Sequence, residues 1–103
     1  AGAVGAFLYD GAARGGARAL GRDAGEIAAG RLADLMAVDT GHPTLCALSE
    51  GQILDGLCFA APDGVVTDVW AAGRHRVSGG RHVARDAVAV RYRQAVAALV
   101  SAA

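Results

Sequence analysis

A strongly alternating β pattern at residues 65–84 constrains the fold more than any other feature of this sequence. A valine-rich stretch runs to a turn at Gly73, the chain returns, and a second glycine-containing turn leads to another short stretch. The expected strands are residues 65–72, 74–77 and 82–84. We therefore predict a three-stranded antiparallel meander, in which Val66, Asp68 and Trp70 share one face.

Apolar side chains at helical spacing predict three helices around this meander. The expected helices are residues 3–20, 53–61 and 87–101. Ser49 and Gln52 have the form of a capping box before the second helix. Asp86 is placed to cap the last helix, whose apolar stripe includes Val88 and Tyr92 and is expected to dock on its own domain.

The apolar run Leu35–Val38, between Asp34 and Asp39, predicts a buried strand. The two acids are five positions apart, so their side chains point to opposite faces of a strand, which argues against a shared acid–base role. We instead expect Asp34 to anchor a turn or a cap.

The length of 103 residues is sufficient for one small domain or for a piece of a larger one. Ten arginines balance ten acidic residues, and this net charge of zero argues against nucleic acid or an anionic membrane as a partner. The first residues lack a basic segment and are too short to span a bilayer. Because the sequence starts without Met and within a helical pattern, we expect a piece of a longer cytoplasmic protein.

The two cysteines, Cys46 and Cys58, lie in apolar surroundings and are expected to be buried free thiols. Together with His42 they suggest a zinc site, but the spacing is loose and structural zinc takes four protein ligands. We therefore interpret His42 as a loop histidine and the two cysteines as thiols of the core. Trp70, among valines, is expected to lie in the core with its N–H bonded to the backbone.

A basic stretch surrounds the predicted hairpin. Its members are Arg74, His75, Arg76, Arg81, His82 and Arg85. An anion or RNA site normally comes with an excess of positive charge in the domain, which is absent here, so we interpret the stretch as a solvated hairpin tip. The glycine pairs at 15–16 and 79–80 lack the spacing of a phosphate loop.

Two segments carry the pattern of a known family. The first is Gly25-x-Ile27-x-x-Gly30-x-x-Ala33-Asp34-Leu35-x-x-x-Asp39. The second is Val66-x-Asp68-Val69-Trp70-x-Ala72-Gly73-Arg74, followed by Gly80-Arg81-His82. In order and spacing they resemble the amidohydrolase superfamily, where the chain leaves a (β/α)8 barrel and completes a small β-sandwich.

The resemblance implies a mixed α/β fragment made of the last barrel helix, the C-terminal strands of a β-sandwich and two further helices. Residues 1–24 would be the barrel helix and exit segment. Residues 25–84 would be the C-terminal part of the sandwich domain with an inserted helix, and residues 85–103 the C-terminal helix.

Within the superfamily, residues 39–45, 57–60 and 66–75 resemble the formimidoylglutamate deiminases of histidine degradation. These enzymes convert N-formimidoyl-L-glutamate to N-formyl-L-glutamate and ammonia. Aminohydrolases of nucleobases or chloro-triazines share much of this region and stay an alternative. A non-catalytic, β-rich interaction domain is the alternative from another class.

The resemblance also implies zinc or another divalent metal in the parent enzyme, where metal-bound water attacks the substrate. The family's ligands include a His-x-His pair, which this sequence lacks. We therefore assign no catalytic, cofactor-binding or metal-binding residue to this chain, and expect it to be inactive alone. The expected partners are the remainder of the parent chain and, in a homo-oligomer, a second copy.

Overall fold

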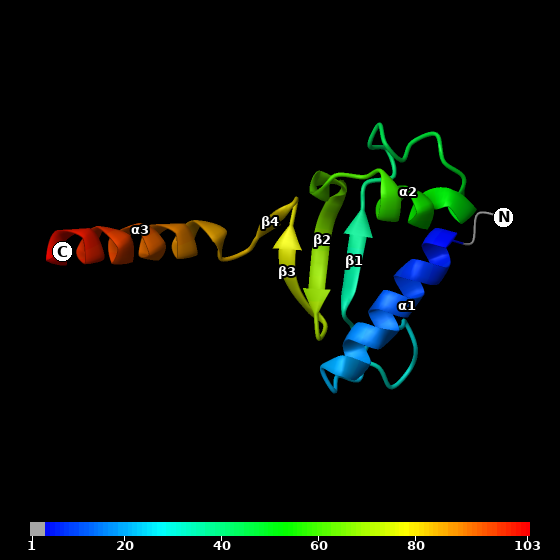
Figure 1. Ribbon diagram of the computed structural model, residues 1–103, viewed down its shortest axis with the longest axis horizontal. Coiled ribbons are helices and arrows are strands. Elements are labelled where there is room, and N and C mark those ends of the chain that lie inside the picture. The colour runs from blue at the N-terminus through cyan, green and yellow to red at the C-terminus, as the bar shows by residue number, and fades with distance from the viewer. Residues whose placement is uncertain (1–3) are drawn as a thin grey trace.

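The computed structural model describes residues 4–103, which form three α-helices and one four-stranded antiparallel sheet (Figure 1). The elements are α1 Val4–Ala19, β1 Leu35–Val38, α2 Ile53–Phe59, β2 Val66–Ala71, β3 Arg74–Ser78, β4 Arg81–His82 and α3 Arg85–Ala102, with short 3-10 turns at Glu50–Gln52 and Asp63–Val65. The predicted mixed α/β class is confirmed. The barrel and sandwich assignments stay predictions, as do the boundaries of the three segments.

The sheet has the strand order β1–β2–β3–β4, so the predicted meander gains a fourth strand at its edge. β1 pairs with β2 in a register that sets Leu35 opposite Trp70. The strand predicted at Leu35–Val38 is confirmed, but the expectation that it is buried is wrong, because β1 is an edge strand and Met36 is 39% exposed. Its apolar run faces an open groove instead of a closed core.

Helices α1 and α2 pack closely at one end of the molecule (Figure 1). The Gly5 backbone N–H donates to Asp55 Oδ1 at 2.6 Å, and a Cβ at Gly5 would collide with the Asp55 backbone. The fully buried apolar side chains of the described residues are Leu45 and Val65. Leu45 packs against Gly56 of α2, and Val65 ends the 3-10 turn that leads into β2.

The ends of the helices differ slightly from the prediction. α1 begins at Val4, and Ala3 lies outside the described residues. α2 ends at Phe59. Before it, the Ser49 backbone N–H donates to Gln52 Oε1 at 3.2 Å, as a capping box requires. Asp86 does not cap α3: the N-cap is Ala84, and Asp86 lies in the first turn, where it pairs with Arg81.

Helix α3 extends away from the sheet beyond β4 and gives the molecule its length of 59 Å (Figure 1). Its apolar stripe does not dock on the rest of the chain, in contrast to our expectation, since Val88 is 58% and Leu99 is 72% exposed. Of the helices between residues 4 and 103, none combines the length and apolar character needed to cross a bilayer.

Candidate functional site

Asp34 lies at the junction of three segments that are distant in the sequence. Its carboxylate accepts two hydrogen bonds from the Arg22 guanidinium, with Nε 2.5 Å from Oδ2 and Nη2 2.8 Å from Oδ1. Oδ1 also accepts the backbone N–H of Ala72 at 2.8 Å. The loop after α1, the entry to β1 and the β2–β3 turn therefore meet at one carboxylate, in agreement with the predicted anchor.

The β2–β3 turn needs this support because of its backbone conformation. Ala72 and Gly73 have φ values of 50° and 78°, the left-handed pair that a two-residue hairpin turn requires. Ala72 is a non-glycine residue and tolerates this conformation poorly. The Gly73 N–H donates to the Ala33 carbonyl at 2.9 Å, next to the Asp34 contact, so two successive residues hold the turn in place.

The same contacts change the acidity of Asp34. The Arg22 guanidinium, and after it the Ala72 N–H, lower the pKa of Asp34 from 3.8 to about 2. Both groups stabilise the charged carboxylate, so Asp34 stays ionised at neutral pH. An ionised carboxylate held by an arginine fork is suited to structural anchoring, and its lone pairs are already engaged.

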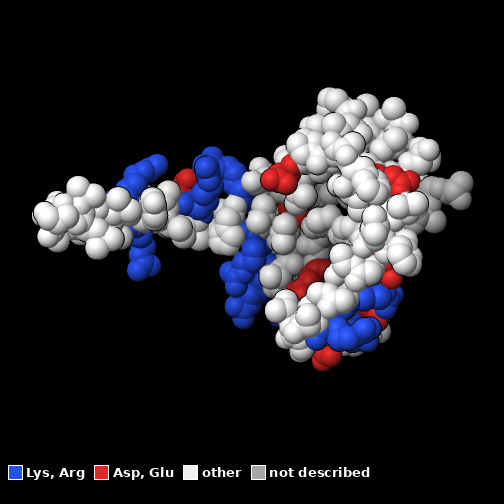
Figure 2. Space-filling model, viewed as in Figure 1, with Lys and Arg blue, Asp and Glu red and all other residues white. Residues whose placement is uncertain are grey.

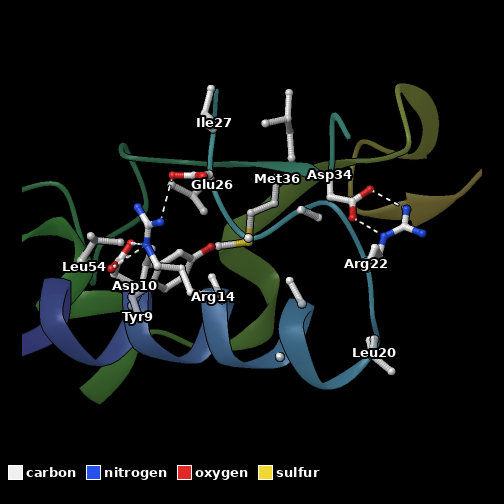
Figure 3. A pocket seen from close by; sticks show the side chains of 18 of the residues that line it. Tyr9, Asp10, Arg14, Leu20, Arg22, Glu26, Ile27, Asp34, Met36 and Leu54 are labelled. Carbon is white, nitrogen blue, oxygen red and sulfur yellow. Dashed lines mark hydrogen bonds and ion pairs between the residues drawn. The ribbon is translucent and has the colours of Figure 1, made fainter. Parts of the chain in front are cut away.

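A groove of about 800 Å³ lies between α1, the loop at residues 22–27, β1 and α2 (Figure 3). Its apolar lining includes Tyr9, Leu20, Ile27, Met36 and Leu54. Figure 3 shows these side chains along the groove, with the Arg22–Asp34 pair at one end. The groove is open to solvent, and the side chains of Leu20 and Ile27 are 80% and 89% exposed.

The charged residues of the groove pair with one another. Arg14 reaches Asp10 from its Nε and Glu26 from its Nη1, both at 2.9 Å, and Arg31 contacts Glu26 at 3.1 Å. The groove is lined by no His, Cys, Ser or Thr among the described residues. Its apolar lining therefore suits packing against an apolar partner, while its charged groups are engaged with one another.

A second polar cluster lies on the sheet. His75 Nε2 lies 2.7 Å from Asp68 Oδ2, and the His75 ring stacks on Trp70 with centroids 4.7 Å apart and an interplanar angle of 12°. The Thr67 hydroxyl, and after it His75, hold the pKa of Asp68 below its ordinary value. Trp70 is half-buried and covered by His75, so the prediction that it lies in the core is wrong.

His42, Cys46 and Cys58 do not converge on one point. His42 Nδ1 contacts the Thr44 hydroxyl at 2.9 Å. The Cys46 thiol lies 3.7 Å from the Pro43 carbonyl oxygen, and the Cys58 thiol lies 3.6 Å from the Gly5 carbonyl oxygen. Both thiols are free, as predicted, but they are exposed, because no segment of residues 4–103 covers them. The part of the chain that the structure describes contains no group of three or more His, Cys, Asp or Glu that could hold a metal.

The basic stretch at the hairpin is exposed, as expected for a solvated tip. Two of its members pair with acidic residues: His75 with Asp68, and Arg81 with Asp86. Sequence reasoning missed the Arg22–Asp34 pair, the paired carboxylates of the groove and the stacking of His75 on Trp70. The two-residue turn after β2 carried a signal for the stacking, since such a turn brings positions 70 and 75 opposite each other.

Known proteins resemble this sequence over most of its length. The profile of the Amidohydrolase family matches residues 7–76. Over 83 residues, the chain is 42% identical to the formimidoylglutamate deiminase of Pseudomonas aeruginosa. The similarity covers 81% of this chain and 18% of that relative, so the chain spans less than a fifth of the length of the curated protein it matches.

Proposed function

The chain belongs to the amidohydrolase family, and we propose that it is the C-terminal structural segment of a metal-dependent enzyme that hydrolyses a C–N bond. The predicted resemblance to this superfamily is confirmed by the family match and by the deiminase relative. The observation that carries the proposal is the 42% identity over 81% of the chain.

The proposed reaction is the hydrolytic deimination of N-formimidoyl-L-glutamate in histidine degradation. Water adds to the formimidoyl carbon and the imino nitrogen leaves as ammonia, so the product is N-formyl-L-glutamate. The name of the relative and the resemblance of residues 39–45, 57–60 and 66–75 support this substrate. We also propose that the longer protein is located in the cytoplasm.

A scaffolding role for this segment is supported by the geometry of its polar groups. Asp34 is engaged by Arg22 and Ala72, and the groove carboxylates are engaged by arginines. The residues of the described chain do not fit a divalent metal, because none of their potential ligands gather in threes. Under the proposal, zinc or another divalent metal is held by residues elsewhere in a longer polypeptide, where it would activate water.

The remainder of such a polypeptide is the first proposed partner. Helix α1 exposes Phe7 at 78% and Val4 at 59%, and the groove beside it is apolar and open. Burying apolar surface of this kind contributes roughly 25 cal/mol per Å², so a segment packed on α1 and the groove would stabilise the fold.

The test compares ammonia release by the full reading frame and by the 103-residue chain, each supplied with zinc. N-formimidoyl-L-glutamate, a nucleobase and a chloro-triazine are offered separately. Release from the first substrate by the longer protein alone supports the deiminase and the structural role of this chain. Release of ammonia from one of the other substrates would identify the enzyme as a related aminohydrolase instead of the deiminase. Activity of the 103-residue chain alone would overturn the proposal that it is non-catalytic. No release by either protein, from any substrate, favours a non-catalytic interaction domain.

A further inference from the structure

Helix α2 holds the first turn of α1 through two polar contacts. The Gly5 backbone N–H donates to Asp55 Oδ1 at 2.6 Å, and the Cys58 thiol lies 3.6 Å from the Gly5 carbonyl oxygen. Asp55 and Cys58 are three positions apart, so they lie on the same face of α2. Gly5, a buried residue of α1, is therefore held by α2 at both its N–H and its carbonyl.

The Asp55 carboxylate supplies a negative charge that the first turn of α1 lacks. The N–H groups of the first turn of a helix have no partners inside the helix, and this end carries partial positive charge. The first turn of α1 contains no acidic residue. Asp55 thus acts as a cap that comes from another helix, 50 positions later in the sequence.

No arginine of the described chain competes with Gly5 for this carboxylate. Residues 32–73 contain six acidic and no basic residues. On the face shown in Figure 2, red carboxylates and no blue side chains lie over the α2 end. Asp34, near the other end of α1, is by contrast engaged by Arg22. Two carboxylates with different partners therefore hold the two ends of this helix.

Helix α2 is itself held by the segment that precedes it. Gly56, next to Asp55, is buried, and a Cβ there would lie 2.6 Å from Leu48 Cδ1 and 2.7 Å from Leu45 Cδ2. Leu45 is one of the fully buried residues of the described chain. Close packing of this kind resists displacement, so the position of Asp55 is fixed by the core as well as by α1.

The proposed function gives the contact between Asp55 and Gly5 a chemical meaning. With α1 as the last helix of a (β/α)8 barrel, the loop that enters α1 lies on the catalytic face, where the reacting groups stand at the strand ends. Gly5 is the second residue of α1, so Asp55 holds the helix at its catalytic end. The Arg22–Asp34 pair lies near the other end of this 16-residue helix, about 24 Å away at 1.5 Å per residue.

We propose that Asp55 is a positioning residue for the proposed hydrolysis. It does not touch the substrate, but it fixes the first turn of α1 and thereby the loop that enters this helix at the catalytic face. The inference rests on the proposed function, with α1 as the last barrel helix. A misplacement of about 1 Å can lower a rate about a hundredfold, so even a small shift of α1 should change kcat.

The test measures ammonia release by the full reading frame, supplied with zinc, from the substrate that the wild type uses. D55A removes the acceptor of the Gly5 N–H. It should lower kcat at least about tenfold and change KM less than about threefold, because orientation of the reacting groups is lost and substrate binding is not. D55N keeps an oxygen that can accept the same N–H, so its kcat should stay within about threefold of the wild type.

Two control variants separate positioning from general stability. E50A removes an exposed carboxylate from the turn before α2, and D34A breaks the anchor near the other end of α1. Both should keep kcat within about twofold of the wild type at a temperature where circular dichroism shows every variant folded. Where D55A does not fold, D55E replaces it: the charge is kept but the longer side chain displaces the oxygens, so kcat should also fall.

Amide hydrogen exchange, followed by mass spectrometry, gives a readout that does not depend on activity. Exchange in the first turn of α1 should be faster in D55A than in the wild type, because the Gly5 N–H has lost its acceptor. Exchange in residues 15–19, at the other end of α1, should be unchanged.

A folded D55A or D55E enzyme with the kcat of an active wild type overturns the positioning role and leaves the proposed hydrolase in place. So does a D55N, E50A or D34A enzyme that is as impaired as D55A, or an unchanged exchange rate in the first turn of α1. A wild type that releases no ammonia from any of the substrates overturns the proposed function, and this inference with it. The two failures therefore give different results.

Discussion

The carboxylate of Asp34 accepts the backbone N–H of Ala72 at 2.8 Å, across 38 positions of sequence. This single contact joins the entry of β1 to the turn that follows β2, and the Arg22 fork joins the same carboxylate to the loop after α1. Asp34 thus links the hairpin turn to the loop after α1, in addition to the β1–β2 pairing and the hydrogen bond from the Gly73 N–H to the Ala33 carbonyl.

Substituting Asp34 should lower the melting temperature of the chain by several degrees. D34N keeps an oxygen that can accept the Ala72 N–H but loses the charge that Arg22 binds, whereas D34A loses both contacts. We therefore expect D34A to melt below D34N, and D34N below the wild type, in thermal denaturation followed by circular dichroism. D23N, at an 86% exposed side chain, is the matched control and should melt like the wild type. Equal melting of D34A and D23N would contradict the anchoring role.

The pKa of Asp34 predicts a loss of stability in acid. The folded-state pKa of about 2 lies below the ordinary value of 3.8, so the unfolded chain binds a proton at this site more readily than the folded chain. The stabilisation is complete above the ordinary value and is lost as pH falls from about 4 through about 2. The difference in melting temperature between wild type and D34N should shrink over this window. A difference that stays constant down to about pH 2 would show that ionisation of Asp34 does not contribute.

The helices and strands of this fold could be predicted from the sequence because they depend on local patterns. The run Leu35–Val38 has the bounds of β1, and Gly73 marks the turn between β2 and β3. Asp34 was expected to anchor a turn or a cap, because its spacing from Asp39 argues against a shared acid–base role. Its partner Arg22 lies twelve positions earlier in an irregular loop, and no periodic pattern relates the two.

Burial was predicted less well than secondary structure. Apolar neighbours suggested that Cys58 and Trp70 are buried, yet the first is exposed and the second is half-buried. Local apolarity indicates which side chains gain from burial, but tertiary packing decides which are covered. With Leu45 and Val65 as the fully buried apolar residues, most apolar side chains of the described chain face solvent.

Gly5 should be intolerant of alanine because two backbones approach each other there. A Cβ at Gly5 would lie 2.5 Å from Asp55 Cα, so G5A must push α1 away from α2. We expect a loss of about 1–3 kcal/mol in the free energy of unfolding, measured by urea denaturation. G11A, in the same helix, is the control: a Cβ there would meet no other atom within 4 Å, so this substitution should gain about 0.5–1 kcal/mol. Equal effects of the two substitutions would show that the close approach is absent.

Trp70 offers a direct probe of the His75 stack, because it is the single tryptophan of the chain. H75A removes the ring that covers one face of the indole, so the fluorescence emission of Trp70 should shift to longer wavelength. H82A, a substitution of an exposed histidine on β4, is the control and should leave the emission unchanged. An emission maximum that is the same in H75A and wild type would argue against the stack.

The same substitution should change the acidity of Asp68. Without His75 the pKa of Asp68 rises toward its ordinary value, although the Thr67 hydroxyl, which is the larger cause, still holds it down. A depressed folded-state pKa stabilises the fold above the unfolded pKa, and this stabilisation disappears as pH falls through the folded one. The acid-induced loss of stability should therefore be smaller in H75A than in the wild type. Carboxyl chemical shifts measured across the acid range give the pKa of Asp68 in each protein and so separate the effect of His75 from that of Thr67. An Asp68 pKa that is identical in H75A and wild type would show that the 2.7 Å contact with His75 does not affect this carboxylate.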